Sequence, residues 1–164
     1  MKIVIHDASV LIDLHRCGLL ESWLAVGVEA HTSDLVMLEV TQPMQKLAAR
    51  GLLHVEHLDV SGLLALRELQ TRQPRSLSFE DCSVLSLAIQ MEAALLTGDA
   101  DLRKAAESEN VEVHGLLWVL DELVAGAHLS PVRAANALQE LLKNHRARLP
   151  KAECNARLER WRTT

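Results

Sequence analysis

KIVIHDASVLIDL, residues 2–14, decides the fold class of this chain of 164 residues. Within it, residues 3–5 (IVI) form a short β-branched apolar run, which is typical of a strand buried on both faces. From residue 10 onward the apolar residues recur at helical spacing, so Asp7 lies where a buried strand gives way to a helix. Open α/β sheets bind their ligands at this carboxyl edge. Asp7 is therefore a candidate functional carboxylate, with a cap for the first helical amides as the alternative.

Strand and helix patterns alternate along the rest of the chain. Further short strands are expected at residues 28–32, 52–58, 93–97 and 111–114. Helices are expected at residues 19–26, 61–69, 78–92, from 102 onward, 116–125 and 130–145, with a last one that ends at Trp161. Another helix should open at Thr32-Ser33-Asp34 and end or kink at Pro43. This alternation predicts an α/β fold in which helices cover a parallel sheet.

The composition limits the class of protein. Hydrophobic residues make up 49% of the chain, which indicates a globular protein. No apolar run is long enough to span a membrane, and the start lacks the pattern of a signal peptide. The three cysteines form no C-x-x-C motif, which favours reduced thiols and a cytoplasmic location. The eight histidines show no zinc-ligand spacing, and the scarcity of aromatic residues argues against a base-stacking platform.

The charge is distributed unevenly along the chain. Residues 1–132 hold nine Lys and Arg against nineteen Asp and Glu, a balance of −10. Residues 133–164 hold eight against three, a balance of +5. An acidic body with a basic tail can indicate contact with nucleic acid, and the alternative is an Arg-rich solvated helix surface. In the first case we expect Arg157, Arg160 and Arg162 to project from the tail toward RNA phosphates.

Four carboxylates occupy comparable positions in this pattern. Asp7 and Asp99 follow expected strands, whereas Glu39 and Asp81 lie in early helical turns on the apolar stripe. Ser78-x-x-Asp81 is also a capping signature, so a structural role stays open for Asp81. Because parallel strands end at one edge of a sheet, we expect the four carboxylates to meet there and share a hydrated ion.

Clustered carboxylates repel one another unless a cation neutralises them. No His or Cys stands at a matching position, so the expected cation is Mg²⁺ or Mn²⁺, which prefer oxygen ligands. Such ions activate water and stabilise the transition state of phosphoryl transfer. The chemistry is that of nucleases and phosphatases. A receiver-type domain or related phosphatase would need a lysine after a late strand, and residues 111–115 offer none.

The four acids and the segments around them resemble those of the PIN-domain (PilT N-terminus-like) nucleases, and among them the VapC-type toxins. The resemblance covers roughly residues 1–130 and rests on four segments: Asp7 in IVIHDASVLIDL, Glu39 in SDLVMLEV, Asp81 in SFEDCSVLSLA and Asp99 in LLTGDADLRKAA. A hydroxyl also stands two residues from each strand-end acid, at Ser9 and Thr97. The resemblance implies a three-layer α/β/α sandwich at residues 1–129, with a C-terminal helical extension at residues 130–164 packed on it.

The resemblance also implies a function. It predicts a Mg²⁺- or Mn²⁺-dependent endoribonuclease that hydrolyses RNA phosphodiester bonds. It further suggests the toxin of a toxin–antitoxin pair, with an antitoxin protein and a second copy of the chain as partners and no membrane contact. The site residues then have four roles: metal binding and catalysis by Asp7, Glu39, Asp81 and Asp99, further metal contact by Asp101, orientation of carboxylates by Ser9 and Thr97, and RNA binding by Arg103 and Lys104.

The chain departs from the family pattern at two positions. His6 precedes the first acid where an apolar or small residue is expected, and it could affect access or proton transfer at the site. Trp118 stands where Gly is common. The alternative function is a non-catalytic PIN-like module that binds RNA or protein and keeps its acids for the fold or for binding.

Overall fold

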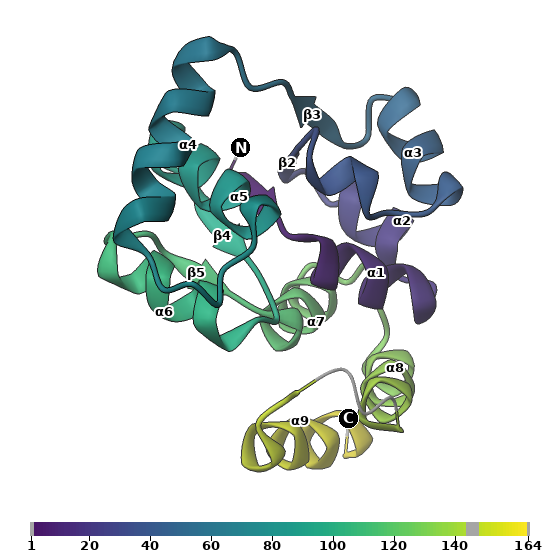
Figure 1. Ribbon diagram of the computed structural model, residues 1–164. Coiled ribbons are helices and arrows are strands. Elements are labelled where there is room, and N and C mark those ends of the chain that lie inside the picture. The colour runs from purple at the N-terminus through teal and green to yellow at the C-terminus, as the bar shows by residue number, and fades with distance from the viewer. Residues whose placement is uncertain (1, 144–147, 164) are drawn as a thin grey trace.

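The structure is a computed structural model that describes residues 2–143 and 148–163. Its centre is a parallel sheet of five strands in the order β3-β2-β1-β4-β5 (Figure 1). The strands are β1 (Ile3–His6), β2 (Glu29–Ser33), β3 (His54–Glu56), β4 (Ala94–Leu96) and β5 (Val113–His114). The strand order reverses direction between β1 and β4, which pair side by side. Ligands of open α/β sheets bind beyond the carboxyl ends of such a pair.

Helices cover both faces of the sheet. One face carries α1 (Ala8–Arg16), α2 (Leu20–Leu24) and α7 (Leu116–Ala125), and the other carries α4 (Val60–Arg72), α5 (Phe79–Gln90) and α6 (Ala100–Ser108). Because side chains alternate along a strand, His6 of β1 contacts Trp23 of α2, whereas Ser33 of β2 contacts Ser83 of α5 on the opposite face. The predicted three-layer α/β/α sandwich is therefore confirmed.

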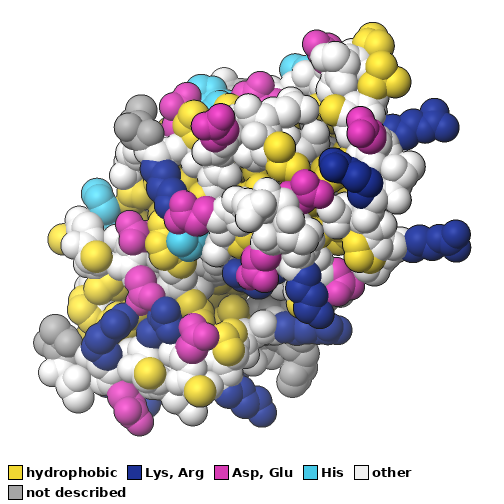
Figure 2. Space-filling model, turned by 90° about the vertical axis from the view of Figure 1, so that its left-hand side faces the viewer, with side chains coloured by type: hydrophobic (Ala, Val, Ile, Leu, Met, Phe, Trp, Pro, Cys, Tyr) yellow, Lys and Arg dark blue, Asp and Glu magenta, His cyan; other side chains and the backbone are white. Residues whose placement is uncertain are grey.

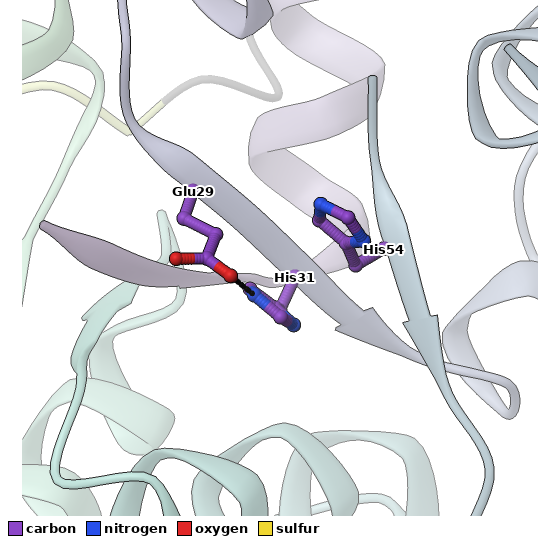
Figure 3. Close-up of side chains that lie close together, drawn as sticks. All are labelled: Glu29, His31 and His54. Atoms are coloured by element: carbon purple, nitrogen blue, oxygen red, sulfur yellow. Dashed lines mark ion pairs between the residues drawn. The ribbon is translucent and has the colours of Figure 1, made fainter. Parts of the chain in front are cut away.

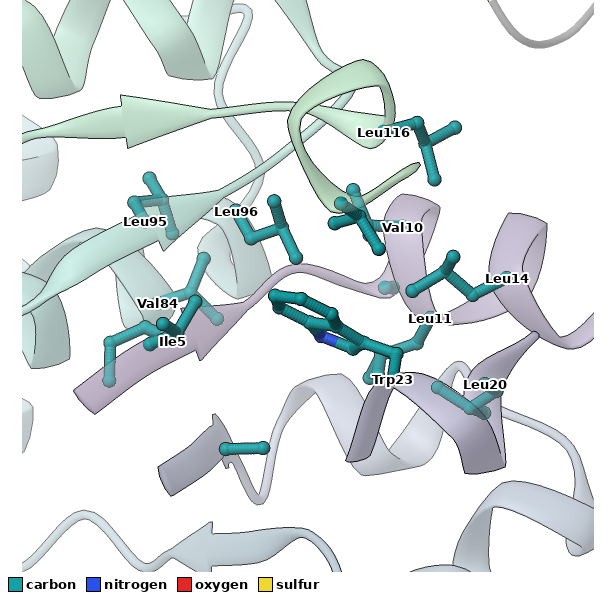
Figure 4. Packing of buried hydrophobic residues seen from close by; sticks show 14 of the residues in the cluster. Ile5, Val10, Leu11, Leu14, Leu20, Trp23, Val84, Leu95, Leu96 and Leu116 are labelled. Carbon is teal, nitrogen blue, oxygen red and sulfur yellow. The ribbon is translucent and has the colours of Figure 1, made fainter. Parts of the chain in front are cut away.

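The core explains why the short strands are so apolar. Ile5 and Leu95 lie against Val84 of α5, and Val10 and Trp23 pack on the other face (Figure 4). These side chains are almost fully buried, so the sheet is covered by apolar groups on both faces, as expected for a parallel sheet. Within the described residues no helix has the length and apolar character that crossing a bilayer requires.

The segment around Glu39 differs from the sequence prediction. In place of one helix that ends at Pro43, the chain forms a 3₁₀ turn, η1 (Val36–Leu38), and then a separate helix, α3 (Gln42–Ala49). Pro43 lies in the first turn of α3, where an amide has no helical acceptor and proline is well tolerated. Glu39 consequently ends the 3₁₀ turn and is exposed, so the prediction that it lies in a helical turn on an inward stripe was wrong.

The C-terminal extension consists of α8 (Pro131–Lys143) and α9 (Lys151–Arg162), which pack against each other. The predicted helix at residues 130–145 corresponds to α8, and residues 144 and 145 lie outside the described part of the chain. The loop between α7 and α8 contains the boundary proposed between residues 129 and 130, which stays a prediction. Trp161 is 2% exposed and is the apolar anchor of α9.

Candidate functional site

Asp7 is the centre of the candidate site. It follows β1 directly and occupies the N-cap position of α1, but its side chain makes no capping hydrogen bond. Instead its Oδ2 accepts hydrogen bonds from Ser9 Oγ at 2.6 Å and from Thr97 Oγ1 at 2.9 Å. The residue is only 6% exposed, and burial raises the pKa of the carboxyl. The two hydroxyls therefore fix a buried carboxylate in one orientation, while the predicted role of Ser9 and Thr97 in orienting a metal ligand stays a prediction.

The same two hydroxyls join Asp7 to the loop after β4. Thr97 Oγ1 accepts a hydrogen bond from the amide of Asp99 at 3.0 Å, and Ser9 Oγ accepts one from the amide of Gly98 at 3.2 Å. Asp99 caps α6, because its Oδ1 accepts from the amides of the second and third residues of the helix. The carboxyl ends of β1 and β4 thus present two acids side by side, one buried and one exposed.

Asp81, at the start of α5, and Glu39, at the end of η1, lie in the same region as Asp7. Asp81 forms a capping box with Ser78 at the start of α5, so the structural role left open for it is real. Its charge nevertheless raises the pKa of Asp7. The pKa of Glu39 is also raised, first by partial burial and then by the negative charges of Glu80, Asp7 and Asp81. Asp7, Glu39 and Asp81 therefore lie close enough at the carboxyl edge of the sheet for their charges to affect one another's pKa. We call Asp7, Glu39 and Asp81, with the adjoining Glu80, the acidic neighbourhood.

Glu80 is a member of this neighbourhood that the sequence interpretation missed. It is half-buried in the first turn of α5. Among the negative charges that raise the pKa of Glu39, the charge of Glu80 has the largest effect, followed by the charges of Asp7 and Asp81. The Glu80-Asp81 pair was visible in the sequence, but α5 alone does not show that both side chains face Glu39. Asp101, by contrast, is exposed on the first turn of α6 and contributes only its amide to the Asp99 cap.

The donor set is suited to a hard divalent cation. In the described part of the chain, no Lys or Arg forms an ion pair with Asp7, Glu39, Asp81 or Asp99, so no described cationic side chain neutralises them directly. Among the same residues, these acids do not form a group of three whose ligand atoms all lie within 4.8 Å of one another. Mg²⁺ keeps several waters and binds through one or two carboxylates, so it does not require contact with three acids at once. Direct contact of one ion with three of them would require the side chains to move.

Comparison with known proteins identifies the family. The family described as DUF3368, a PIN domain, matches residues 3–163. The chain belongs to the PIN-domain family. The match extends to the end of α9, so the family pattern includes both C-terminal helices.

A solved structure supports the fold of this PIN domain. A PilT N-terminus domain protein from the hyperthermophilic archaeon Sulfolobus solfataricus P2 superimposes with a TM-score of 0.52. The two chains share 14% sequence identity, and the alignment covers 73% of this chain and 92% of that one. At this identity the likeness shows the fold alone. A search of curated proteins found no match.

PIN domains are generally metal-dependent nucleases, and this one has a cavity of about 450 Å³ beside its acids. The cavity begins at Thr97 and Gly98, beyond β4, and runs to the chain that leads into α9. Arg103, Arg148 and Arg157 line it, together with Ala100, Val113, His114, Gly115, Leu117, Trp118, Leu149, Pro150 and Glu153. A basic cavity next to acids is a suitable place for the phosphates of a nucleic acid.

The two predicted RNA-binding residues differ in their surroundings. Arg103 is half-buried in the cavity wall, where Nη1 donates to the carbonyl of Val113 at 3.4 Å. Gly115 makes room for it, because a Cβ there would lie 3.2 Å from Arg103 Nη2. Lys104 is exposed on α6 and is not among the residues that line the cavity. Arg148 is a basic cavity residue that the sequence interpretation did not single out.

The two departures from the family pattern have structural roles. His6 is fully buried, and its Nε2 accepts a hydrogen bond from Trp23 Nε1 at 2.8 Å. Desolvation lowers the pKa of His6 to about 4, so the side chain is neutral at pH 7 and faces the α2 layer. Trp118 stacks on His114, with 4.0 Å between ring centroids, and forms part of the cavity wall. Its ring therefore shapes the space next to the acids.

Proposed function

We propose that this PIN domain is a Mg²⁺- or Mn²⁺-dependent endoribonuclease that hydrolyses RNA phosphodiester bonds. The observation that carries the proposal is the Asp7 carboxylate. It is buried at the point where the strand order reverses, it is not used as a helix cap, and two hydroxyls hold it in place. A structural acid in this position would be expected to have a cationic partner, because burial of an unpaired charge is costly.

The divalent ion, when bound, activates water and neutralises charge on the phosphate. Asp7 would bind it most directly, and Glu39, Asp81 and Asp99 would hold it through its remaining waters. Ser9 and Thr97 keep the Asp7 carboxylate oriented for this purpose. Arg103 and Arg148 would bind the RNA phosphates on the far side, in the cavity next to Thr97 and Gly98.

The substitution Asp7→Asn tests the proposal. It keeps the shape of the side chain and an oxygen that can accept from Ser9 and Thr97, while it removes the charge. We expect cleavage of labelled RNA with Mg²⁺ or Mn²⁺ to fall by more than about a hundredfold, because losing a group that merely orients a ligand already costs roughly 10–100-fold. The variant should unfold at the same or slightly higher urea concentration, since an acid in an active site commonly costs stability.

Asp59→Asn is the matched control, because Asp59 caps α4 and lies outside the candidate site. Asparagine is an equally good cap, so this variant should cleave RNA as the wild type does. Equal cleavage by the Asp7→Asn variant would exclude Asp7 as a ligand. RNA binding without cleavage by the wild-type protein would favour the non-catalytic module. Asp81 and Asp99 cap helices α5 and α6, so both acids have a structural role that the non-catalytic module would also need.

We also propose that the chain is the toxin of a toxin–antitoxin pair and that it forms a homodimer. Apolar side chains exposed at the start of α4, on Val60, Leu63 and Leu64, support a protein partner on that surface. Sedimentation of the purified protein tests the homodimer, and a monomer at micromolar concentration would contradict it. Co-purification with the product of an adjacent small reading frame tests the toxin–antitoxin pair.

A further inference from the structure

A cluster of two histidines and a glutamate lies on the sheet away from the acids described above. Glu29 is the first residue of β2, His31 lies two residues further on the same strand, and His54 begins the edge strand β3 (Figure 3). His31 and His54 are paired in the sheet register, and their rings stack with centroids 4.8 Å apart. Within the described residues, these three side chains are a group whose ligand atoms all lie within 4.8 Å of one another.

The central histidine is held by a fourth side chain. Glu56 Oε1 lies 2.7 Å from His31 Nδ1, and a carboxylate can only accept, so Nδ1 carries the proton. Histidines that bind metal ions almost always donate their other ring N–H to a carboxylate or carbonyl in this way. The contact leaves Nε2 as the atom of His31 that can face an ion.

Nε2 of His31 has no hydrogen-bond partner although the residue is only 5% exposed. It lies 3.4 Å from Glu29 Oε1, but the contact does not have the geometry of a hydrogen bond. A buried polar atom without a partner is costly. A proton on Nε2 would be expected to align with the carboxylate, whereas a lone pair beside a carboxylate oxygen is repelled by it. An ion between the two atoms would satisfy both.

The spacing also fits an ion of the zinc type. Ligand bonds of 2.0–2.1 Å in tetrahedral geometry place neighbouring ligand atoms about 3.3 Å apart. The separation of 3.4 Å between His31 Nε2 and Glu29 Oε1 is close to this value. His54 is exposed, so its ring is free to turn the short distance that would complete the site. Imidazole ligands favour Zn²⁺ over Mg²⁺, which prefers oxygen.

We infer that Glu29, His31 and His54 form a binding site for a divalent transition metal ion such as Zn²⁺, with Glu56 orienting His31 and water as the fourth ligand. The ion would join the edge strand β3 to β2, which pair through three residues and are also joined by the contact between Glu56 and His31. The site lies toward the opposite end of β2 from the carboxyl edge and is independent of the proposed nuclease function.

Binding of Zn²⁺ to EDTA-treated full-length protein tests the inference. Titration calorimetry should show one ion bound per chain, and Co²⁺ in its place should give the intense visible absorption of a tetrahedral site. His54→Gln should lower the affinity for Zn²⁺ by about a hundredfold or more, and Glu56→Gln by roughly 10–100-fold. Zn²⁺ should raise the melting temperature of the wild type and not that of the His54→Gln variant.

Two matched variants make the result unambiguous. His57→Gln removes an exposed histidine three residues further on that contacts Asp34 outside the cluster, and it should bind Zn²⁺ as the wild type does. Asp7→Asn tests whether Zn²⁺ enters the carboxylate site instead. The inference is overturned if His54→Gln binds Zn²⁺ with unchanged affinity, if Asp7→Asn alone abolishes binding, or if the wild type binds none.

Discussion

Asp7 carries a charge that the folded protein makes costly. Burial raises the pKa of its carboxyl, the hydrogen bonds from Ser9 and Thr97 lower it, and the charge of Asp81 raises it again. The folded protein therefore binds a proton at this carboxyl more readily than the unfolded chain does. This contribution to stability grows as the pH falls through the raised pKa and is lost as the pH rises above it. A bound cation would remove the cost at neutral pH.

The buried His6 has the opposite effect on the pH dependence of stability. Its folded pKa is about 4 against 6.5 in the unfolded chain, so between these values the unfolded state binds the extra proton. Stability should therefore fall by about 3 kcal/mol, at 1.36 kcal/mol per pKa unit, as the pH drops from 6.5 to 4. In the His6→Gln variant, urea denaturation at several pH values should show a smaller decline over this window.

His15→Gln is the control for this prediction, because His15 is exposed in the last turn of α1. Its stability should follow the pH dependence of the wild type. If His6→Gln and the wild type lose stability in parallel between pH 6.5 and 4, then His6 is not the buried neutral group described here.

At the level of elements, α9 is fastened to the body by an ion pair with α7. Both Nε and Nη2 of Arg157 donate to Asp121 Oδ2, at 2.9 and 2.6 Å, and Arg160 Nη2 donates to Asp121 Oδ1 at 2.6 Å. Arg157 and Arg160 therefore hold the helix in place. The expectation that Arg157 projects from the tail was wrong, because its side chain is only 19% exposed. The side chain of Arg160 is 61% exposed, and its contact with RNA stays a prediction. Arg162 is exposed, as expected.

A double-mutant cycle measures this attachment. Arg157→Gln and Asp121→Asn should each lower the free energy of unfolding by about 1–3 kcal/mol, because each leaves a partly buried charged group without its partner. The double variant should lose less than the sum of the two, with a coupling energy of at least about 0.5 kcal/mol in urea denaturation. Arg162→Gln should change nothing. Strictly additive losses would mean that the pair does not fasten α9.

Over the whole molecule, much of the positive charge lies in the C-terminal extension. Lys and Arg side chains gather on the lower part of the face shown in Figure 2, where the C-terminal helices lie. Arg148 brings this charge to the cavity that Arg103 also lines, whereas the charge of Arg157 is paired with Asp121. The basic tail thus offsets the acidic body next to the candidate site, which would otherwise repel RNA.

This arrangement predicts the salt dependence of RNA binding. Arg103→Gln and Arg148→Gln should each weaken binding to single-stranded RNA irrespective of its sequence. Each should also reduce the slope of log affinity against log salt concentration by roughly 0.7, the value for one phosphate contact. Fluorescence anisotropy with Ca²⁺ in place of Mg²⁺ measures binding without cleavage. Arg162→Gln is the control, and unchanged slopes in the first two variants would place the RNA elsewhere.

The sequence by itself determined the α/β architecture of this protein. The apolar run of residues 3–5, the change of period after Asp7 and the repeated alternation of strand and helix predict a parallel sheet between helix layers, because these patterns reflect local burial. Asp7, Asp99 and their hydroxyl neighbours could be found in the same way, since their positions follow from where strands end. The segment after Asp34 was misassigned, because Pro43 can begin a helix as readily as it ends one.

Only the tertiary structure decided which side chains meet. Glu80 reaches Glu39 because the start of α5 lies beside the turn after β2, and neither segment encodes that contact. His31 and His54 show no ligand spacing along the chain, yet strand pairing stacks their rings. The sequence indicated that Arg157 is exposed to solvent, whereas the packing of α9 on α7 places it against Asp121. In each case the physical reason is the same: local patterns fix which face of an element is buried, whereas the packing of distant elements fixes its polar partners.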